Sequence, residues 1–105
     1  MNLALRPDPD LPELFEPTRA EHLLDAACAI LDLALAAGDP SLAPHIDACV
    51  LADELLFRAQ AVHEAAATLG NEKLAADEAR QSYAAAQLKI WHLDRLDRHL
   101  FPESH

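Results

Sequence analysis

The chain has 105 residues with a formal net charge of −10, and 51% of its residues are hydrophobic. The apolar residues are mostly helix formers, 22 Ala and 19 Leu against five Val and Ile together, so the composition predicts an all-α fold and excludes a β-sheet protein. A chain this acidic is repelled by phosphate backbones and anionic lipid headgroups, which argues against direct binding to nucleic acid or to a membrane.

The first 17 residues contain four prolines, at positions 7, 9, 12 and 17. Proline lacks an amide donor and forces an extended backbone before it, so residues 1–17 are predicted to form an extended N-terminal arm. This segment is polar and does not resemble a signal peptide, and the two cysteines form no CxxC pair. We therefore expect a cytoplasmic protein with reduced thiols.

A first helix is predicted over residues 18–37. Thr18 and Glu21 have the spacing of a capping box at its start, and Gly38 followed by Pro40 is typical of a helix end. The helix is apolar almost all the way round, which predicts that other helices surround it. Asp25 and Asp32 interrupt the apolar run, which is also shorter than the roughly 20 residues that a membrane span needs.

Two long helices follow, from about residue 41 to 69 and from about residue 71 to 100. Gly70 separates them, and Pro102 follows the second one. Apolar residues three and four apart predict the packed stripe of each helix. The stripe of the first long helix is Ala48, Leu51, Leu55, Ala59, Val62, Ala66 and Leu69, and that of the second is Ala79, Tyr83, Ala86, Ile90, Leu93, Asp97 and Leu100.

These elements predict one domain over residues 18–101, an antiparallel three-helix bundle in which a shorter helix packs on a long helical hairpin, with a C-terminal tail over 102–105. A turn at Gly70 pairs residues whose numbers add to about 140, so residues 84–86 lie opposite 55–57 and Asp53 lies near Lys89. The shorter helix leaves part of the hairpin uncovered. This surplus apolar surface predicts a protein partner or a second copy, and we expect a homodimer.

A second interpretation concerns the sequence HIDACVLADE at residues 45–54. His45, Cys49 and Asp53 share one helix face, and folding the first helix back at Gly38 brings Cys28 toward Cys49. Thiolate and imidazole ligands suit zinc or copper. No recognised ligand spacing is present, however, and a buried cysteine is commonly a small apolar residue. A metal site at these four residues is therefore kept as an alternative, and no cofactor is assigned.

The sequence KIWHLDRLDRHLF at residues 89–101 is the candidate partner-binding surface. An aromatic residue beside arginines is typical of interface hot spots. The alternative places Trp91 in the core and pairs the bases with acids of the preceding helix, and a third interpretation, contact with RNA, conflicts with the net charge. The candidate partner-binding residues are Leu88, Lys89, Trp91, Arg95, Leu96 and Arg98.

No catalytic constellation is evident. The three serines lie on no glycine-flanked elbow, and two isolated glycines build no phosphate-binding loop. We therefore expect a non-enzymatic interaction protein, an adaptor, regulator or inhibitor. Residues 1–54 carry 11 acids and two bases, net −9, which also allows an acidic inhibitor that occupies the nucleic-acid-binding groove of another protein, as phage-borne inhibitors do. A metal- or cofactor-binding bundle is the third hypothesis.

Overall fold

The computed structural model describes residues 16–104, and within that range it contains helices and turns but no strand. This confirms the all-α prediction and the long helical hairpin. The helices are α1 (Pro17–Asp25), α2 (Ala27–Ala37), α3 (Ala43–Thr68) and α4 (Glu72–Leu100), with single turns of 3-10 helix at Pro40–Leu42 and Pro102–Ser104. None of the helices in this range has both the length and the apolar character needed to cross a bilayer.

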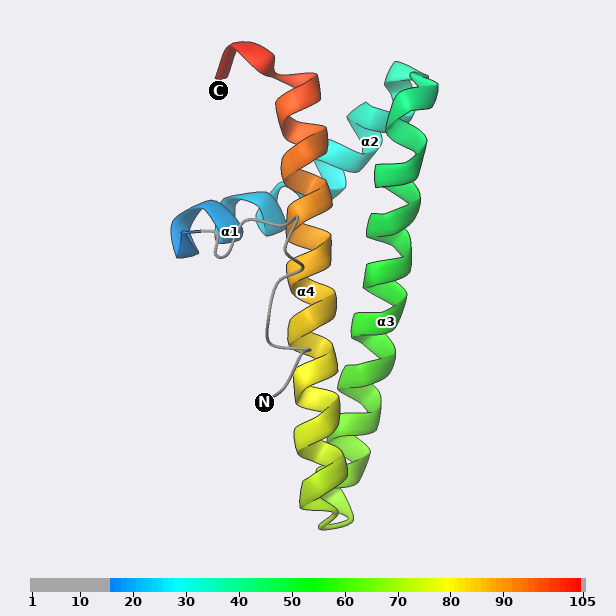
Figure 1. Ribbon diagram of the computed structural model, residues 1–105, viewed down its shortest axis with the longest axis vertical. Coiled ribbons are helices and arrows are strands. Elements are labelled where there is room, and N and C mark those ends of the chain that lie inside the picture. Colours follow the sequence, from blue (N-terminus) through cyan, green and yellow to red (C-terminus); the bar gives the residue numbers. More distant parts are fainter. Residues whose placement is uncertain (1–15, 105) are drawn as a thin grey trace.

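The antiparallel helices α3 and α4 lie side by side and set the 48 Å length of the structure (Figure 1). The turn between them uses Gly70 at a φ of 76°, and the Asn71 side chain accepts a hydrogen bond from the Leu74 amide that caps α4. Lys89 Nζ lies 2.5 Å from an Asp53 carboxylate oxygen, which confirms the predicted register of the hairpin.

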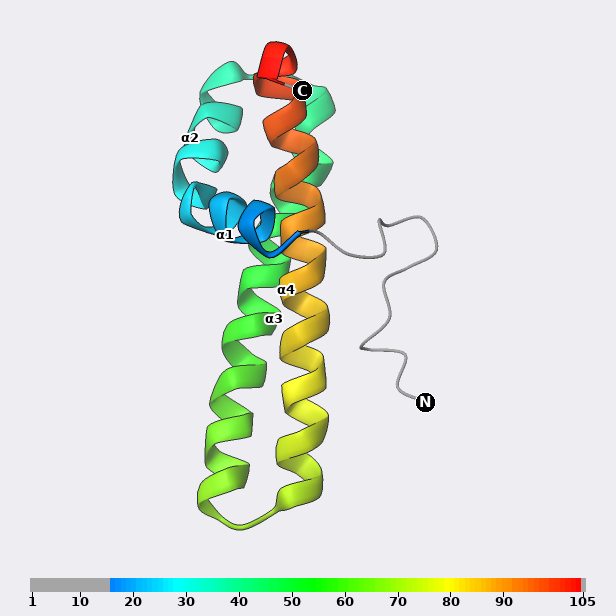
Figure 2. The ribbon, with the colours of Figure 1, turned by 90° about the vertical axis from the view of Figure 1, so that its left-hand side faces the viewer.

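The prediction of one uninterrupted helix over residues 18–37 is wrong. Ala26, at a φ of −89° and a ψ of 1°, separates α1 from α2. Helix α1 runs across the hairpin (Figure 1), while α2 runs along it (Figure 2). The bend allows Leu23 of α1 and Ile30 of α2 to pack into the same core. The predicted capping box is also wrong, because α1 begins at Pro17, whose missing amide is harmless in a first turn. The remainder of the predicted arm, residues 1–15, lies outside the described residues.

The core is concentrated where α1 and α2 cover the hairpin, which we call the core end (Figure 2). Packing of α2 is mainly against α4, whereas the sequence predicted that the first helix would fold back along α3. The buried residues of this core are Leu23, Ala27, Ile30, Ala34, Leu42, Cys49, Ile90, Leu93 and Leu96.

Small side chains hold together the other part of the hairpin, residues 50–88, which we call the turn half. Its buried apolar residues are all alanines: Ala52, Ala59, Ala66, Ala75 and Ala85. Three of them follow a seven-residue spacing along α3, the repeat that keeps one helix face against a neighbour. Large apolar residues of the turn half are exposed instead: Val50, Leu51, Leu55, Phe57, Leu69, Leu74, Tyr83 and Leu88. The predicted packed stripe of α3 is therefore wrong for its leucines.

Candidate functional site

A groove of about 190 Å³ lies between α3 and α4 in the turn half of the hairpin. Two of its three alanines, Ala59 and Ala85, are buried, while Leu55 and Leu88 are 43% and 39% exposed. Its lining residues are Leu55, Arg58, Ala59, Glu78, Gln81, Ala84, Ala85 and Leu88. Large exposed side chains flanking an alanine floor suit the packing of another helix, whose side chains fit between such ridges.

The side of α4 that carries Leu88 continues beyond the groove toward the core end. Leu88, Trp91 and Arg95 share this side, because a helix has about 3.6 residues per turn. The Arg95 guanidinium carbon lies 4.6 Å from the Trp91 ring centroid, a cation–π contact. Ile90 and Leu93, which pack in the core with residues of α1 and α2, lie on the other side of α4. The groove therefore faces away from the two short helices.

The structure divides the six predicted partner-binding residues into two groups. Leu88 lines the groove, and Trp91 and Arg95 lie on the same side of α4, beyond the lining residues. The other three are engaged within the chain: Lys89 pairs with Asp53, Arg98 Nε donates to Asp94 at 2.8 Å, and Leu96 is fully buried. The alternative in which the bases pair with acids of α3 therefore holds for Lys89 but not for Arg98, whose partner is in α4.

Trp91 belongs to a cluster with two histidines, which sequence reasoning did not identify. Its ring meets the His92 ring edge-on at a centroid distance of 4.8 Å, and the His45 ring of α3 lies 6.0 Å away. The Nδ1 atoms of His45 and His92 are 2.8 Å apart. The Trp91 indole N–H is buried and has no hydrogen-bond partner among residues 16–104. Only the hairpin register, not the spacing on either helix, could have indicated this cluster.

Burial lowers the pKa of both histidines. The positive charge of Arg95 lowers the pKa of His45 further, and His45 in turn lowers the pKa of His92. A hydrogen bond between two Nδ1 atoms needs one ring to donate and the other to accept, so it exists when the accepting ring is neutral. The hydrogen bond therefore requires at least one neutral ring, and burial favours the neutral form of both.

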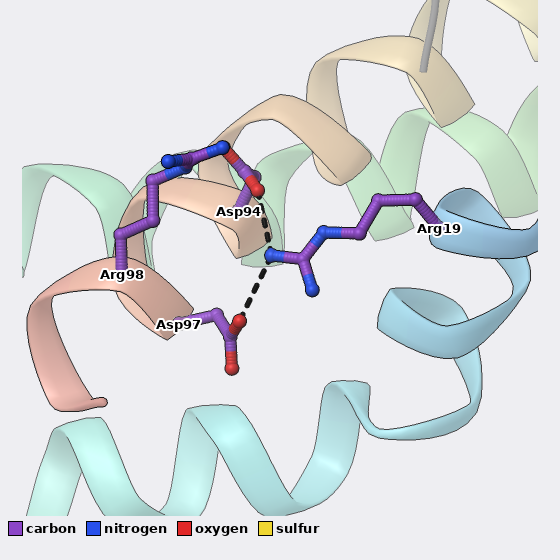
Figure 3. Close-up of polar contacts among 4 residues, drawn as sticks. All are labelled: Arg19, Asp94, Asp97 and Arg98. Atoms are coloured by element: carbon purple, nitrogen blue, oxygen red, sulfur yellow. Dashed lines mark hydrogen bonds and ion pairs between the residues drawn. The ribbon is translucent and has the colours of Figure 1, made fainter. Parts of the chain in front are cut away.

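An ion-pair network ties α1 to α4 (Figure 3). Arg19 Nη2 donates to Asp94 Oδ1 at 2.7 Å and to Asp97 Oδ2 at 2.9 Å, and both aspartates are buried. Burial acts to raise the pKa of Asp94, but hydrogen bonds from Arg19 and Arg98 outweigh it and lower that pKa. The sequence could have indicated this network, because Asp94 and Asp97 lie among the apolar residues of α4 and buried acids need a base.

The structure does not bring together the four residues of the predicted metal site. Cys28 is exposed on α2, whereas Cys49 is buried with its Sγ 3.9 Å from the Lys89 carbonyl oxygen. Asp53 pairs with Lys89, and His45 with His92. Among the residues described, no three His, Cys, Asp or Glu side chains lie together where they could hold a metal ion. The bend at Ala26 and the packing of α2 on α4 separate Cys28 from the others.

The buried thiol of Cys49 has low reactivity. Burial raises the pKa of Cys49 to about 11, although nearby Lys89 acts to lower it, so the thiol is protonated at neutral pH. A protonated thiol is a poor nucleophile and a poor metal ligand.

Comparisons with protein-family models, with curated protein sequences and with solved structures find no match to this chain.

Proposed function

We propose that this chain is a non-enzymatic interaction protein, an adaptor, regulator or inhibitor that joins another protein chain along the groove between α3 and α4. The observation that supports this proposal is the arrangement of the turn half, with alanines inside and Leu51, Leu55 and Leu88 outside. Covering an exposed leucine is favourable by about 25 cal/mol per Å² of apolar surface removed from water. A single scattered leucine is ordinary on a protein surface, but Leu55 and Leu88 line one groove, and Leu51 lies one turn before Leu55 on α3.

The groove suits a helical segment as its ligand. Two antiparallel helices with a small-residue floor leave space for a third helix that places apolar side chains at positions i, i+3 or i+4, and i+7. Both cysteines are free, so the interaction needs no disulfide, and we place it in the reducing cytoplasm.

Site-specific photo-crosslinking in the cells that make the protein tests this proposal. A photo-reactive amino acid replaces Leu55 in the groove, and the control replaces Leu35 of α2, which is 63% exposed. We expect covalent protein adducts from position 55 and few from position 35. Equal adducts from both positions, or none from position 55, would overturn the proposal.

A second candidate function uses a different surface. Glu21, Asp25 and Asp32 are exposed along α1 and α2, and none of them forms an ion pair within residues 16–104. These charges support an acidic inhibitor that occupies the nucleic-acid-binding groove of a partner. Such a complex would weaken steeply as salt rises and would compete with DNA or RNA. Leu55→Glu would leave it intact, whereas Asp25→Lys with Asp32→Lys would abolish it.

A further inference from the structure

We infer that the chain occupying the groove is a second copy of this protein, so that two hairpins form a four-helix bundle. This inference rests on the proposed function, because it names the occupant of the same groove. It is carried by two observations, the match between large and small side chains along the groove and a pair of opposite charges on its rim.

The match between large and small side chains follows from the register of the hairpin. Contacts between α3 and α4 join residues whose numbers add to about 140, as His45 with His92 and Asp53 with Lys89 show. A two-fold axis parallel to the hairpin would place α3 of each copy on α4 of the other at the same level, with every neighbouring pair of helices antiparallel. In that arrangement Leu55 packs over Ala84 of the second copy, Leu51 against Leu88, and Ala48 beneath Trp91.

The charges on the rim are Arg58 on α3 and Glu78 on α4. Both line the groove, and neither takes part in an ion pair within the described residues. In the two-fold arrangement Arg58 of each copy is level with about residue 82 of the other, roughly one helical turn from Glu78, which the long arginine side chain can reach. Because the axis repeats every contact, one complementary pair becomes two.

The available surface is large enough for a dimer. Residues 48–69 of α3 cover about 33 Å at 1.5 Å per residue, and two adjacent helices, each about 10 Å wide, present a footprint of roughly 650 Å². A standard interface removes about 800 Å² of accessible surface from each partner, and accessible surface exceeds the flat footprint it covers. Helices α1 and α2 lie on the side of the hairpin away from the groove, so they do not obstruct the second copy.

Charge reversal with purified full-length protein tests this inference. Molar mass is measured by light scattering and sedimentation over a range of concentrations for the wild type, Arg58→Glu, Glu78→Arg and an equal mixture of the two variants. Far-ultraviolet circular dichroism confirms that each variant is helical. Both substitutions lie at the groove surface, and Gln60→Glu on the exposed side of α3 is the matched control.

We expect the wild type at twice the 11.5 kDa of one chain and each single variant with a dimer dissociation constant raised about tenfold or more by like charges. The mixture restores the dimer, because Arg58→Glu and Glu78→Arg chains complement each other. A monomeric wild type, or a mixture that stays monomeric when each variant alone is monomeric, overturns the inference, as does a dimer that neither substitution weakens.

The photo-crosslinking at position 55 separates this inference from the proposed function. An adduct of two copies of the chain supports both. An adduct with a different protein supports the proposed function and overturns the inference. Absence of any adduct from position 55, together with a monomeric wild type, overturns both.

Discussion

Arg19 of α1 and Asp94 of α4, separated by 75 positions in the sequence, are joined by a hydrogen bond of 2.7 Å. The same guanidinium nitrogen reaches Asp97, so one arginine on a short helix serves two buried acids on a long one. This contact anchors α1 across the hairpin, because α1 contributes only Leu23 as a fully buried large side chain. The position of α1 is therefore set by an ion-pair network as well as by apolar packing.

Removing the base from this network should destabilise the protein. We expect Arg19→Met to lower the free energy of unfolding by about 1–2 kcal/mol, because it leaves two buried carboxylates with one partner fewer, and the partly exposed Arg19 keeps the loss below that of a fully buried pair. Urea denaturation followed by circular dichroism measures the change. Arg80→Met, which removes the more exposed pair with Asp77, is the control and should cost less than about 0.5 kcal/mol.

Acid should weaken the protein through the pair formed by His45 and His92. Both have a folded-state pKa below the ordinary value of 6.5, so the unfolded chain binds more protons as the pH falls below about 7. The free energy of unfolding should therefore decline between about pH 7 and pH 5, with a slope that cannot exceed about 1.4 kcal/mol per pH unit for each proton.

The double variant His45→Gln with His92→Gln should flatten this decline, as measured by urea denaturation at a series of pH values. Fluorescence of Trp91, the only tryptophan in the chain, reports on the same cluster. His22→Gln on the exposed surface of α1 serves as the matched loss of a histidine. A double variant with the same pH dependence as the wild type would contradict the role of the pair.

The two thiols should differ sharply in reactivity. Cys28 is exposed, whereas Cys49 is fully buried and has a pKa raised to about 11. A chromogenic disulfide reagent at neutral pH should modify one thiol quickly, and the second only as the chain unfolds. In Cys28→Ser the fast phase should disappear. Two fast thiols in the wild type would show that Cys49 is accessible.

The alanine interior of the turn half predicts low tolerance for larger side chains. Ala85 is 4% exposed between α3 and α4, so Ala85→Leu should lower the free energy of unfolding by about 1–3 kcal/mol through overpacking. Ala61→Leu on the exposed side of α3 should change it by less than about 0.5 kcal/mol. Calorimetry or urea denaturation gives both values, and a stabilising Ala85→Leu would mean that the helices stand further apart.

Much of the fold follows from local sequence signals. Gly38 and Gly70 both adopt positive φ, in agreement with their positions at the predicted helix ends, and the hairpin register follows from the turn at Gly70. The face that each helix turns inward was harder to predict. Leu51 and Leu55 lie beside Ala52, Ala59 and Ala66 around α3, so apolar spacing could not decide whether leucines or alanines would meet α4.

The parts that sequence reasoning missed depend on distant residues. The bend at Ala26 has no local glycine or proline signal, and its benefit lies in core contacts that exist only after α4 is in place. Arg19 finds its acids 75 and 78 positions away, beyond any helical spacing. Of the candidate partner residues, Leu88 lines the groove, whereas the places of Leu55 and Arg58 in it became evident only from the structure.

The uneven interior divides the hairpin into two regions of different local stability. Leucine and isoleucine contacts at the core end keep backbone amides there closed until the whole molecule unfolds, whereas the alanine contacts of the turn half permit local opening at a smaller free energy. In a solitary chain, hydrogen exchange near Gly70 therefore runs faster than near Leu93. If a chain binds in the groove as proposed, it should slow hydrogen exchange in the turn half, so that association would raise the local stability of this region.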